Sequence, residues 1–111
     1  MTIDKNLQEL HAPLDIEIIN ILLSIIPETW WSVRLDVEYV KISDDEVGYP
    51  IKISNNEGEK DIVMPPNELY EKIGKHAAIF REYGKQWKKI EYNAAYDEST
   101  EDWQYTIDYE Y

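Results

Sequence analysis

The chain has no cysteine among its 111 residues, and it contains only 4 glycines and 1 phenylalanine. Without thiols it can form no disulfide, no zinc–thiolate site and no cysteine nucleophile. Basic side chains are also scarce, because 11 lysines and arginines stand against 23 aspartates and glutamates, giving a net charge of −12 at pH 7. We therefore expect no direct binding to nucleic acid or to anionic membranes, since both require basic groups. A basic protein partner is compatible with this charge.

The sequence also lacks an apolar stretch long enough to cross a bilayer, which takes about 20 residues. Its most apolar segment, residues 18–26, follows acidic rather than basic residues and runs into Pro-Glu-Thr-Trp. That pattern does not match a secretory signal peptide, which has a basic start and a small-residue cleavage site. The length fits one domain, which we expect to span residues 1–111. These features predict a cytoplasmic protein.

Two segments have the periodicity of amphipathic helices. For residues 15–26 we expect Asp15 to cap the N-terminus and Pro27 to mark the end. A separate short helix over residues 2–11 is expected to stop near Pro13. The second segment begins and ends with residues suited to helix boundaries, and its apolar stripe lies within 66–84 as Leu69, Ile73, Ala77 and Phe80.

The remaining segments alternate apolar and polar residues as half-buried strands do. Strands are expected over residues 31–39, 49–53, 62–64, 87–97 and 102–111, separated by turns rich in Asp, Asn, Ser and Gly. The predicted fold class is α+β, an antiparallel sheet of about five strands with helices on one face, in the order α-β-β-β-α-β-β. The residues expected to face the helices and form the core are Trp31, Val33, Leu35, Val37, Tyr92, Tyr105, Ile107 and Tyr109.

The polar positions of three of these strands carry an excess of acid. They are Arg34, Asp36, Glu38, Lys89, Glu91, Asn93, Ala95, Asp97, Asp102, Gln104, Thr106, Asp108 and Glu110. After Lys89 the chain has no basic residue at all. Solvated sheets usually mix charges of both signs, because like charges opposite each other destabilise the pairing. The one-sign hairpin therefore indicates a binding surface, although negative charge that serves solubility alone would give the same pattern.

No pattern in the chain points to catalysis. His11 and His76 lie outside any catalytic motif, and we expect them to be surface or structural residues. The turns "SDDE" and "DESTED" lack the spacing of a calcium-binding loop, and there is no glycine-rich phosphate loop. We therefore expect no catalytic residue, no metal site and no cofactor, and the protein is not predicted to be an enzyme.

Several motifs resemble those of a known family. "LSIIPETWWSVRLDVEY" is similar to the opening of the YezG-like immunity (antitoxin) proteins of bacteria, in which an apolar helix runs into Ile-Pro-Glu-x-Trp and then a strand. The second helix "MPPNELYEKIGK", the segment "FREYGKQWKKIEYNAAYD" and the closing hairpin "WQYTIDYEY" resemble the later elements, so that the resemblance covers most of residues 15–111. This final hairpin is richer in tyrosine and acid than the family pattern. The resemblance implies a protein without catalytic residues that blocks a toxin, often a nuclease, by binding it.

The leading hypothesis is an immunity protein whose acidic surface covers the basic active-site region of a cognate toxin domain, with a nuclease as the first candidate. The expected partner-binding residues are Asp36, Glu38, Glu91, Asp97, Glu98, Glu101, Asp102, Trp103, Asp108 and Glu110. The loops "SDDEVG" and "SNNEGE" are the alternative interface. A small cytoplasmic interaction scaffold, or a small ligand-binding or hydrolytic domain, is the alternative function. Toxin identity, strand order and oligomeric state are not predicted.

Overall fold

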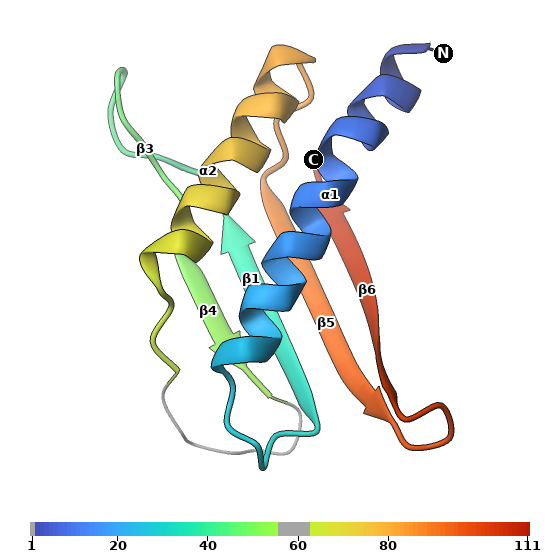
Figure 1. Ribbon diagram of the computed structural model, residues 1–111. Coiled ribbons are helices and arrows are strands. Elements are labelled where there is room, and N and C mark those ends of the chain that lie inside the picture. The colour runs from blue at the N-terminus through green and yellow to red at the C-terminus, as the bar shows by residue number, and fades with distance from the viewer. Residues whose placement is uncertain (1, 56–62) are drawn as a thin grey trace.

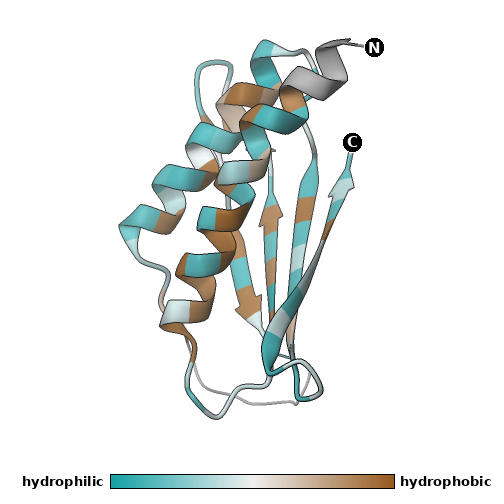
Figure 2. Ribbon diagram, turned by 45° about the vertical axis from the view of Figure 1, so that its right-hand side comes forward, coloured by the Kyte–Doolittle hydropathy of each residue, from teal (hydrophilic) through white to brown (hydrophobic). Residues whose placement is uncertain are grey.

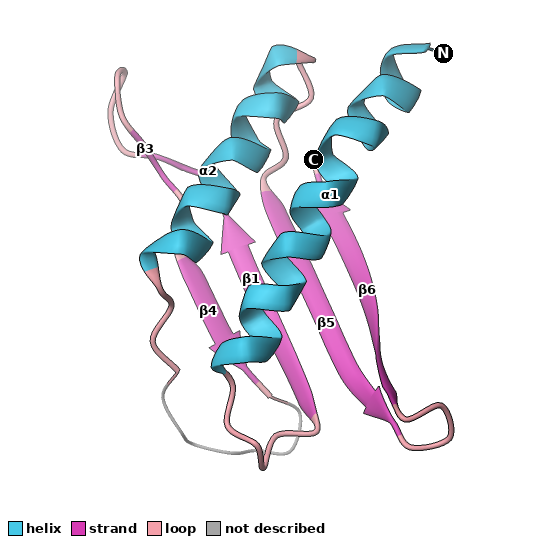
Figure 3. Ribbon diagram, viewed as in Figure 1, coloured by secondary structure: helices cyan, strands magenta, loops and turns pink. Residues whose placement is uncertain are grey.

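The computed structural model of the chain describes residues 2–55 and 63–111, with the side chains of the first helix described from Leu7 onward. The fold has two layers, with both helices packed on one face of an antiparallel sheet (Figures 1 and 3). In chain order the elements are α1 (Thr2–Ile25), β1 (Ser32–Glu38), β2 (Val40–Lys41), β3 (Val47–Gly48), β4 (Ile51–Ser54), α2 (Asn67–Glu82), β5 (Lys89–Asp97) and β6 (Asp102–Glu110).

The main sheet has four strands in the order β4-β1-β5-β6, and every neighbouring pair is antiparallel. A second, two-stranded ribbon of β2 and β3 makes up the connection between β1 and β4. The predicted α+β class and the helices on one face are confirmed, with four strands in the sheet instead of about five. Of the expected strand at 62–64, Ile62 lies outside the described residues, while Val63 and Met64 are not in a strand. Most of the "SNNEGE" turn, residues 56–59, also lies outside them.

The first helix differs from the prediction, because α1 runs without a break through Pro13. Proline removes one hydrogen bond inside a helix, which is why the sequence suggested two helices. Here the helix buries Leu7 before the proline and Ile18 after it, while Pro13 itself is exposed. Packing on both sides therefore outweighs the lost bond, since tertiary contacts supply most helix stability in proteins. The expected cap, Asp15, consequently lies inside the helix and is buried.

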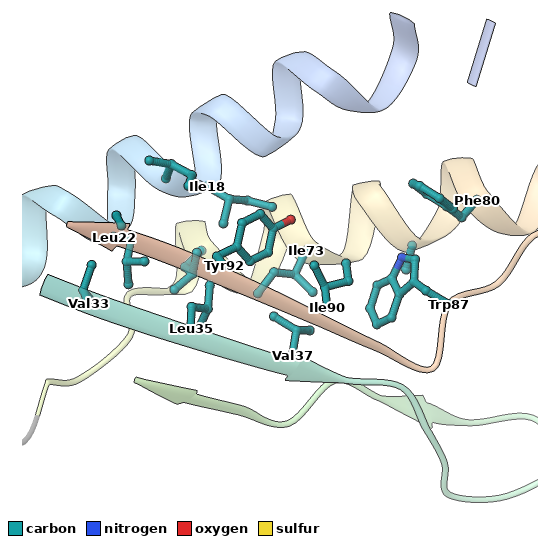
Figure 4. Close-up of a cluster of buried hydrophobic side chains, with 14 of the residues drawn as sticks. Ile18, Leu22, Val33, Leu35, Val37, Ile73, Phe80, Trp87, Ile90 and Tyr92 are labelled. Atoms are coloured by element: carbon teal, nitrogen blue, oxygen red, sulfur yellow. The ribbon is translucent and has the colours of Figure 1, made fainter. Parts of the chain in front are cut away.

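The core fills the space between the helices and the sheet (Figure 4). Four of the predicted core residues, Val33, Leu35, Val37 and Tyr92, are almost completely buried. They pack with side chains of both helices, of the segment leading into β5 and of β5 itself, namely Ile18, Leu22, Leu69, Ile73, Phe80, Trp87 and Ile90. The strand register explains the match, because Leu35 pairs with Tyr92 and both point to the helix side. Ile107 and Tyr109 of β6 are partly buried against the same core.

The prediction for the tandem tryptophans is wrong, since Trp31 is 54% exposed and its neighbour Trp30 is only 3% exposed. The cause is a turn before β1, in which the backbone N–H of Trp30 donates to the carbonyl of Pro27 at 3.0 Å. This turn directs the first indole into the core, while β1 begins only at Ser32. Extending the alternation of β1 back to residue 31 therefore predicted that the wrong one of the two tryptophans is buried.

Tyr105 was also expected in the core, but it is 47% exposed. Figures 1 and 2 show the reason: α1 crosses the sheet obliquely, covering the C-terminal part of β6 and leaving its first half uncovered. Tyr109, farther along the strand, does contact α1 through a hydrogen bond to Asp15. The alternation along β6 is thus as predicted, but the helix layer is too narrow to bury the whole strand.

Gly74 inside α2 and Gly84 just after it give a matched test of the helix and its end. A Cβ added at Gly74 would meet nothing within 4 Å, whereas Gly84, which follows the helix, has a φ of +66°. We predict that Gly74→Ala raises the free energy of unfolding by up to about 1 kcal/mol, because alanine is the better helix former. Gly84→Ala should lower it by about 1–2 kcal/mol, because a side chain is strained at positive φ. Urea denaturation of both variants measures the two changes in the free energy of unfolding. If both variants were stabilised, or both destabilised, the conformations assigned to Gly74 and Gly84 would be contradicted.

Candidate functional site

The face of the sheet opposite the helices carries the polar side chains expected there, because these positions alternate along the strands with the buried ones. Strand register lines up Asp36 of β1, Glu91 of β5 and Asp108 of β6 in one row across the sheet. The next row joins Glu38, Lys89 and Glu110. Neither helix covers these rows. We call the side of the sheet that carries them the open face. The structure therefore brings the predicted acidic residues of three strands together.

The centre of the open face is partly neutralised by its own cations. Arg34 holds Asp36 through two nitrogens, at 3.0–3.2 Å, and its Nη2 also contacts Glu91. Lys89 lies 3.5 Å from Asp36. The carboxylates of Asp36 and Glu91 are thus satisfied inside the protein, so that a partner gains less from them than sequence analysis assumed.

Most of the other predicted acids lie on β6 and in the β5–β6 turn. The exposed ones are Glu38 at the end of β1, Glu98, Glu101, Asp102, Asp108 and Glu110. Within residues 2–55 and 63–111, none of them forms an ion pair with a lysine or arginine. Uncompensated negative charge is therefore concentrated at one edge of the sheet rather than spread over the whole face.

The turn between β5 and β6 constrains two of the predicted acids, Asp97 and Glu101. Asp97 accepts hydrogen bonds from the hydroxyl and the backbone N–H of Ser99 at 2.6 and 2.9 Å, which lower the pKa of its carboxyl. Glu101 has a φ of 56°, a conformation that side chains other than glycine and asparagine rarely adopt. The turn therefore keeps Asp97 ionised and places a carboxylate where a glycine would be less strained.

The open face is hollowed by three shallow depressions. The largest, about 360 Å³, lies over β4, β1 and the start of β5 and includes Arg34, Glu38 and Lys52. Two others, of about 250 and 170 Å³, lie over β5 and β6 beside Ala95 and Asp108 respectively. Depressions of this kind do not enclose a small molecule as ligand sites do. They are suited to the protruding side chains of a partner protein.

A second polar cluster, which sequence analysis missed, lies beneath the helices. The carboxylate of Asp15 accepts hydrogen bonds from the Tyr92 hydroxyl at 2.7 Å and from the Tyr109 hydroxyl at 2.9 Å. His11 Nδ1 lies 2.7 Å from the same carboxylate and His76 Nε2 lies 2.9 Å from it. One side chain of α1 is therefore bonded to partners on α1, α2, β5 and β6. The spacing of four between His11 and Asp15 would have revealed part of this cluster if one continuous helix had been predicted.

The protonation pattern of this cluster follows from its donors. A carboxylate only accepts, so His11 donates through Nδ1–H and His76 through Nε2–H. The Nδ1 atom of His76 is buried without a hydrogen-bond partner, which suits a bare ring nitrogen and not a second N–H. Burial raises the pKa of both Tyr92 and Tyr109, so their hydroxyls stay protonated and continue to donate.

Burial alone would raise the pKa of the Asp15 carboxyl, since it disfavours the charged form. The hydrogen bonds from His76, Tyr92 and His11 outweigh burial and hold the pKa below its ordinary value of 3.8. Asp15 is therefore an ionised carboxylate, 4% exposed, whose acceptor positions are occupied. It joins the two layers and has little capacity left to act on a substrate.

His11, Asp15 and His76 could also be read as a metal site, because their ligand atoms all lie within 4.8 Å of one another. Two histidines and a carboxylate suit zinc and similar ions. A metal at Nε2 of His76 would, however, require the proton on Nδ1, and ligating histidines normally donate that proton to an acceptor. None of the described residues offers an acceptor there. The donor set favours a structural network over a metal centre.

Comparison of the sequence with known protein families and with curated proteins gives no match. The similarity to immunity proteins consequently rests on the motifs given above. Neither helix in the described part of the chain is long and apolar enough to span a membrane.

We predict that Asp15→Asn lowers the free energy of unfolding by at least about 3 kcal/mol. The amide group would turn an N–H toward buried donors, and each unsatisfied buried group costs about 1–3 kcal/mol. Denaturation in urea at pH 7 checks this, with Asp45→Asn on the exposed β2–β3 turn as a control that should change stability by less than about 0.5 kcal/mol. A loss below about 1 kcal/mol for Asp15→Asn would contradict a central role for the carboxylate.

The same cluster predicts a pH dependence. Because the folded-state pKa of Asp15 lies below the unfolded-state value, its contribution is complete above about pH 4 and is lost as pH falls through the folded value. The wild-type protein should therefore lose stability faster than Asp15→Asn between about pH 4 and pH 2. If the stability of the two proteins fell by the same amount between about pH 4 and pH 2, this assignment would be contradicted.

We further predict that zinc added in molar excess leaves the melting temperature unchanged, because the cluster is already satisfied without an ion. Thermal unfolding followed by circular dichroism measures this. A saturable rise in melting temperature that disappears in His76→Gln would instead establish a metal site.

Proposed function

We propose that this protein is an immunity protein that binds and neutralises a basic toxin domain, with a nuclease as the first candidate. The single observation that carries the proposal is the segregation of charge on the open face. Apart from Glu38, its exposed carboxylates lie along β6 and the β5–β6 turn, away from the internal pairs of Arg34. The motif resemblance to YezG-like proteins supports the same reading.

Binding would use the charge in two ways. Exposed carboxylates such as Asp108 and Glu110 would attract a basic surface from a distance and speed the encounter. A nuclease binds the phosphates of its substrate with basic groups, so carboxylates seated among them would occupy the substrate's place. Inhibition would thus be both steric and electrostatic, without chemistry by the immunity protein. The proposal locates the protein in the cytoplasm, where an incoming nuclease would reach nucleic acid.

The buried cluster supports a binding protein over a hydrolytic enzyme. A catalytic base needs access to substrate, but the side chain of His76 is 0% exposed and that of Asp15 is 5% exposed. The carboxylate is already held by two tyrosine hydroxyls. We therefore assign this cluster to stability and the open face to function, with an interaction scaffold for another basic protein as the alternative.

We predict that reversing Asp108 and Glu110 to lysine slows association with the toxin by roughly tenfold or more, since exposed charges steer encounter. The fold should be retained, because both side chains are exposed. The toxin domain is isolated by affinity capture, and surface plasmon resonance then measures association over a range of salt concentrations. The wild-type rate should fall as salt screens the charges, with a screening length of about 8 Å in physiological salt.

The matched control reverses Asp44 and Asp45 to lysine on the exposed β2–β3 turn, which changes net charge by the same amount. This control should associate close to the wild-type rate and should still protect cells that carry the toxin. If the association rate of the control falls as much as that of the Asp108/Glu110 variant, the rate depends only on net charge and not on where the carboxylates lie. If the control alone loses binding, the interface is the "SDDEVG" loop and the open face is a solvated surface.

A further inference from the structure

A row of aromatic rings lies at one end of the sheet on the side of the helices, with Trp31 and Tyr105 exposed and Tyr96 and Trp103 partly exposed. The centroids of Trp31 and Tyr96 are 5.4 Å apart, and those of Tyr96 and Trp103 are 5.9 Å apart. Tyr105 follows on the same side of β6. We call these four residues the aromatic end. It lies beyond the part of the sheet that α1 crosses (Figure 1).

The aromatic end is not needed to fill the core. Trp31 is 54% and Tyr105 is 47% exposed, while Trp30 and Trp87 already supply buried indoles. Tryptophan and tyrosine are the residue types that most often anchor protein interfaces, where an exposed ring is desolvated by the partner. An exposed tryptophan that is joined through Tyr96 to the partly exposed Trp103 therefore suits a surface that another molecule covers.

The charge beside these rings specifies the chemistry of that molecule. Tyr96 and Trp103 are register partners, and the next pair along the strands is Asp97 and Asp102. The two exposed acids Glu98 and Glu101 complete the turn that follows. By strand alternation Asp97 and Asp102 point to the open face, so the acids nearest the rings are Glu98 and Glu101 of the turn, and the sequence provides no basic residue after Lys89.

We propose that the aromatic end binds arginine side chains of a basic protein segment. A guanidinium can stack on the faces of Trp31 and Trp103 and at the same time pair with a carboxylate of the adjoining turn, such as that of Glu101. Lysine fits less well, because its ammonium is compact and strongly hydrated and does not stack. This inference rests on the proposed function for the identity of its partner, an arginine-rich surface of the toxin domain.

The aromatic end and the open face can serve one partner together. β6 is the edge strand of the sheet, with the open face on one side and the aromatic rings on the other. Both surfaces therefore meet at the free edge of β6 and at the β5–β6 turn. A partner that covers this edge would gain steering from Asp108 and Glu110 and desolvated contact area from Trp31 and Trp103.

The test uses a peptide of nine arginines and, for comparison, one of nine lysines, titrated into the ¹⁵N-labelled protein. The four indole N–H signals serve as reporters, since Trp31 and Trp103 belong to the site and the buried Trp30 and Trp87 report on the fold. We expect the arginine peptide to shift the first two signals and not the last two, and to bind roughly fivefold or more tightly than the lysine peptide.

Two variants make the result specific. Trp31→Ala should weaken the arginine peptide roughly fivefold, whereas Tyr70→Ala, which removes an equally exposed ring on α2, should leave binding unchanged. Glu98→Gln with Glu101→Gln should weaken binding more than Asp45→Asn with Glu46→Gln, which removes the same charge elsewhere. Unmoved indole signals of Trp31 and Trp103, or wild-type affinity for Trp31→Ala, would overturn the inference.

Failure here is distinguishable from failure of the proposed function, because the peptide assay needs no toxin. If Trp31→Ala binds the arginine peptide normally while the Asp108/Glu110 variant still fails to bind toxin, the aromatic assignment falls and the immunity proposal stands. If the peptide results hold but no toxin is inhibited, the arginine site stands and the partner is a different basic protein.

Discussion

The buried carboxylate of Asp15 is the constraint on which the arrangement of the layers depends. A charge taken out of water must be satisfied by donors, since the cost of leaving it unpaired is several kcal/mol. Its donors come from α1, α2, β5 and β6, so they are together only when both helices sit in one position over the sheet. Apolar packing brings the layers together, while this network selects one relative placement of them.

That placement determines what the rest of the surface can do. With both helices on one side, the other side of the sheet is left to polar residues, and Arg34 and Lys89 offset the repulsion at its centre. Toward β6 the acids lack such pairs, and α1 leaves the first half of that strand uncovered (Figure 2). The same oblique crossing therefore exposes the aromatic rings and puts them beside the acidic turn. Stability is concentrated under the helices, and the features suited to binding lie on the other face of the sheet and at the end of β6 that α1 leaves uncovered.

Much of this could be predicted from local patterns. Alternation placed Leu35, Val37 and Tyr92 in the core and Asp36 and Asp108 on the other face, because side-chain direction in a strand depends only on sequence position. The stripe of α2 was equally reliable, since Leu69, Ile73, Ala77 and Phe80 are all buried.

What could not be predicted depends on contacts between distant segments. The continuity of α1 through Pro13 is decided by packing on both sides of the proline, and local propensity points the other way. The Asp15 network joins residues up to 94 positions apart, so only the helix pair of His11 and Asp15 leaves a sequence signal. The exposure of Tyr105 depends on the crossing direction of α1 and that of Trp31 on the turn before β1, and no periodicity encodes either.

The central claim is that the edge formed by β5 and β6 binds a basic partner while the helices serve the fold. Hydrogen–deuterium exchange of the complex with the isolated toxin domain tests it most directly, because each segment reports separately on protection. The account predicts added protection in residues 89–110 and in the segment around Trp31, with α1 and α2 exchanging as in the free protein. Protection confined to the two helices, with the β5–β6 hairpin unchanged, would contradict it.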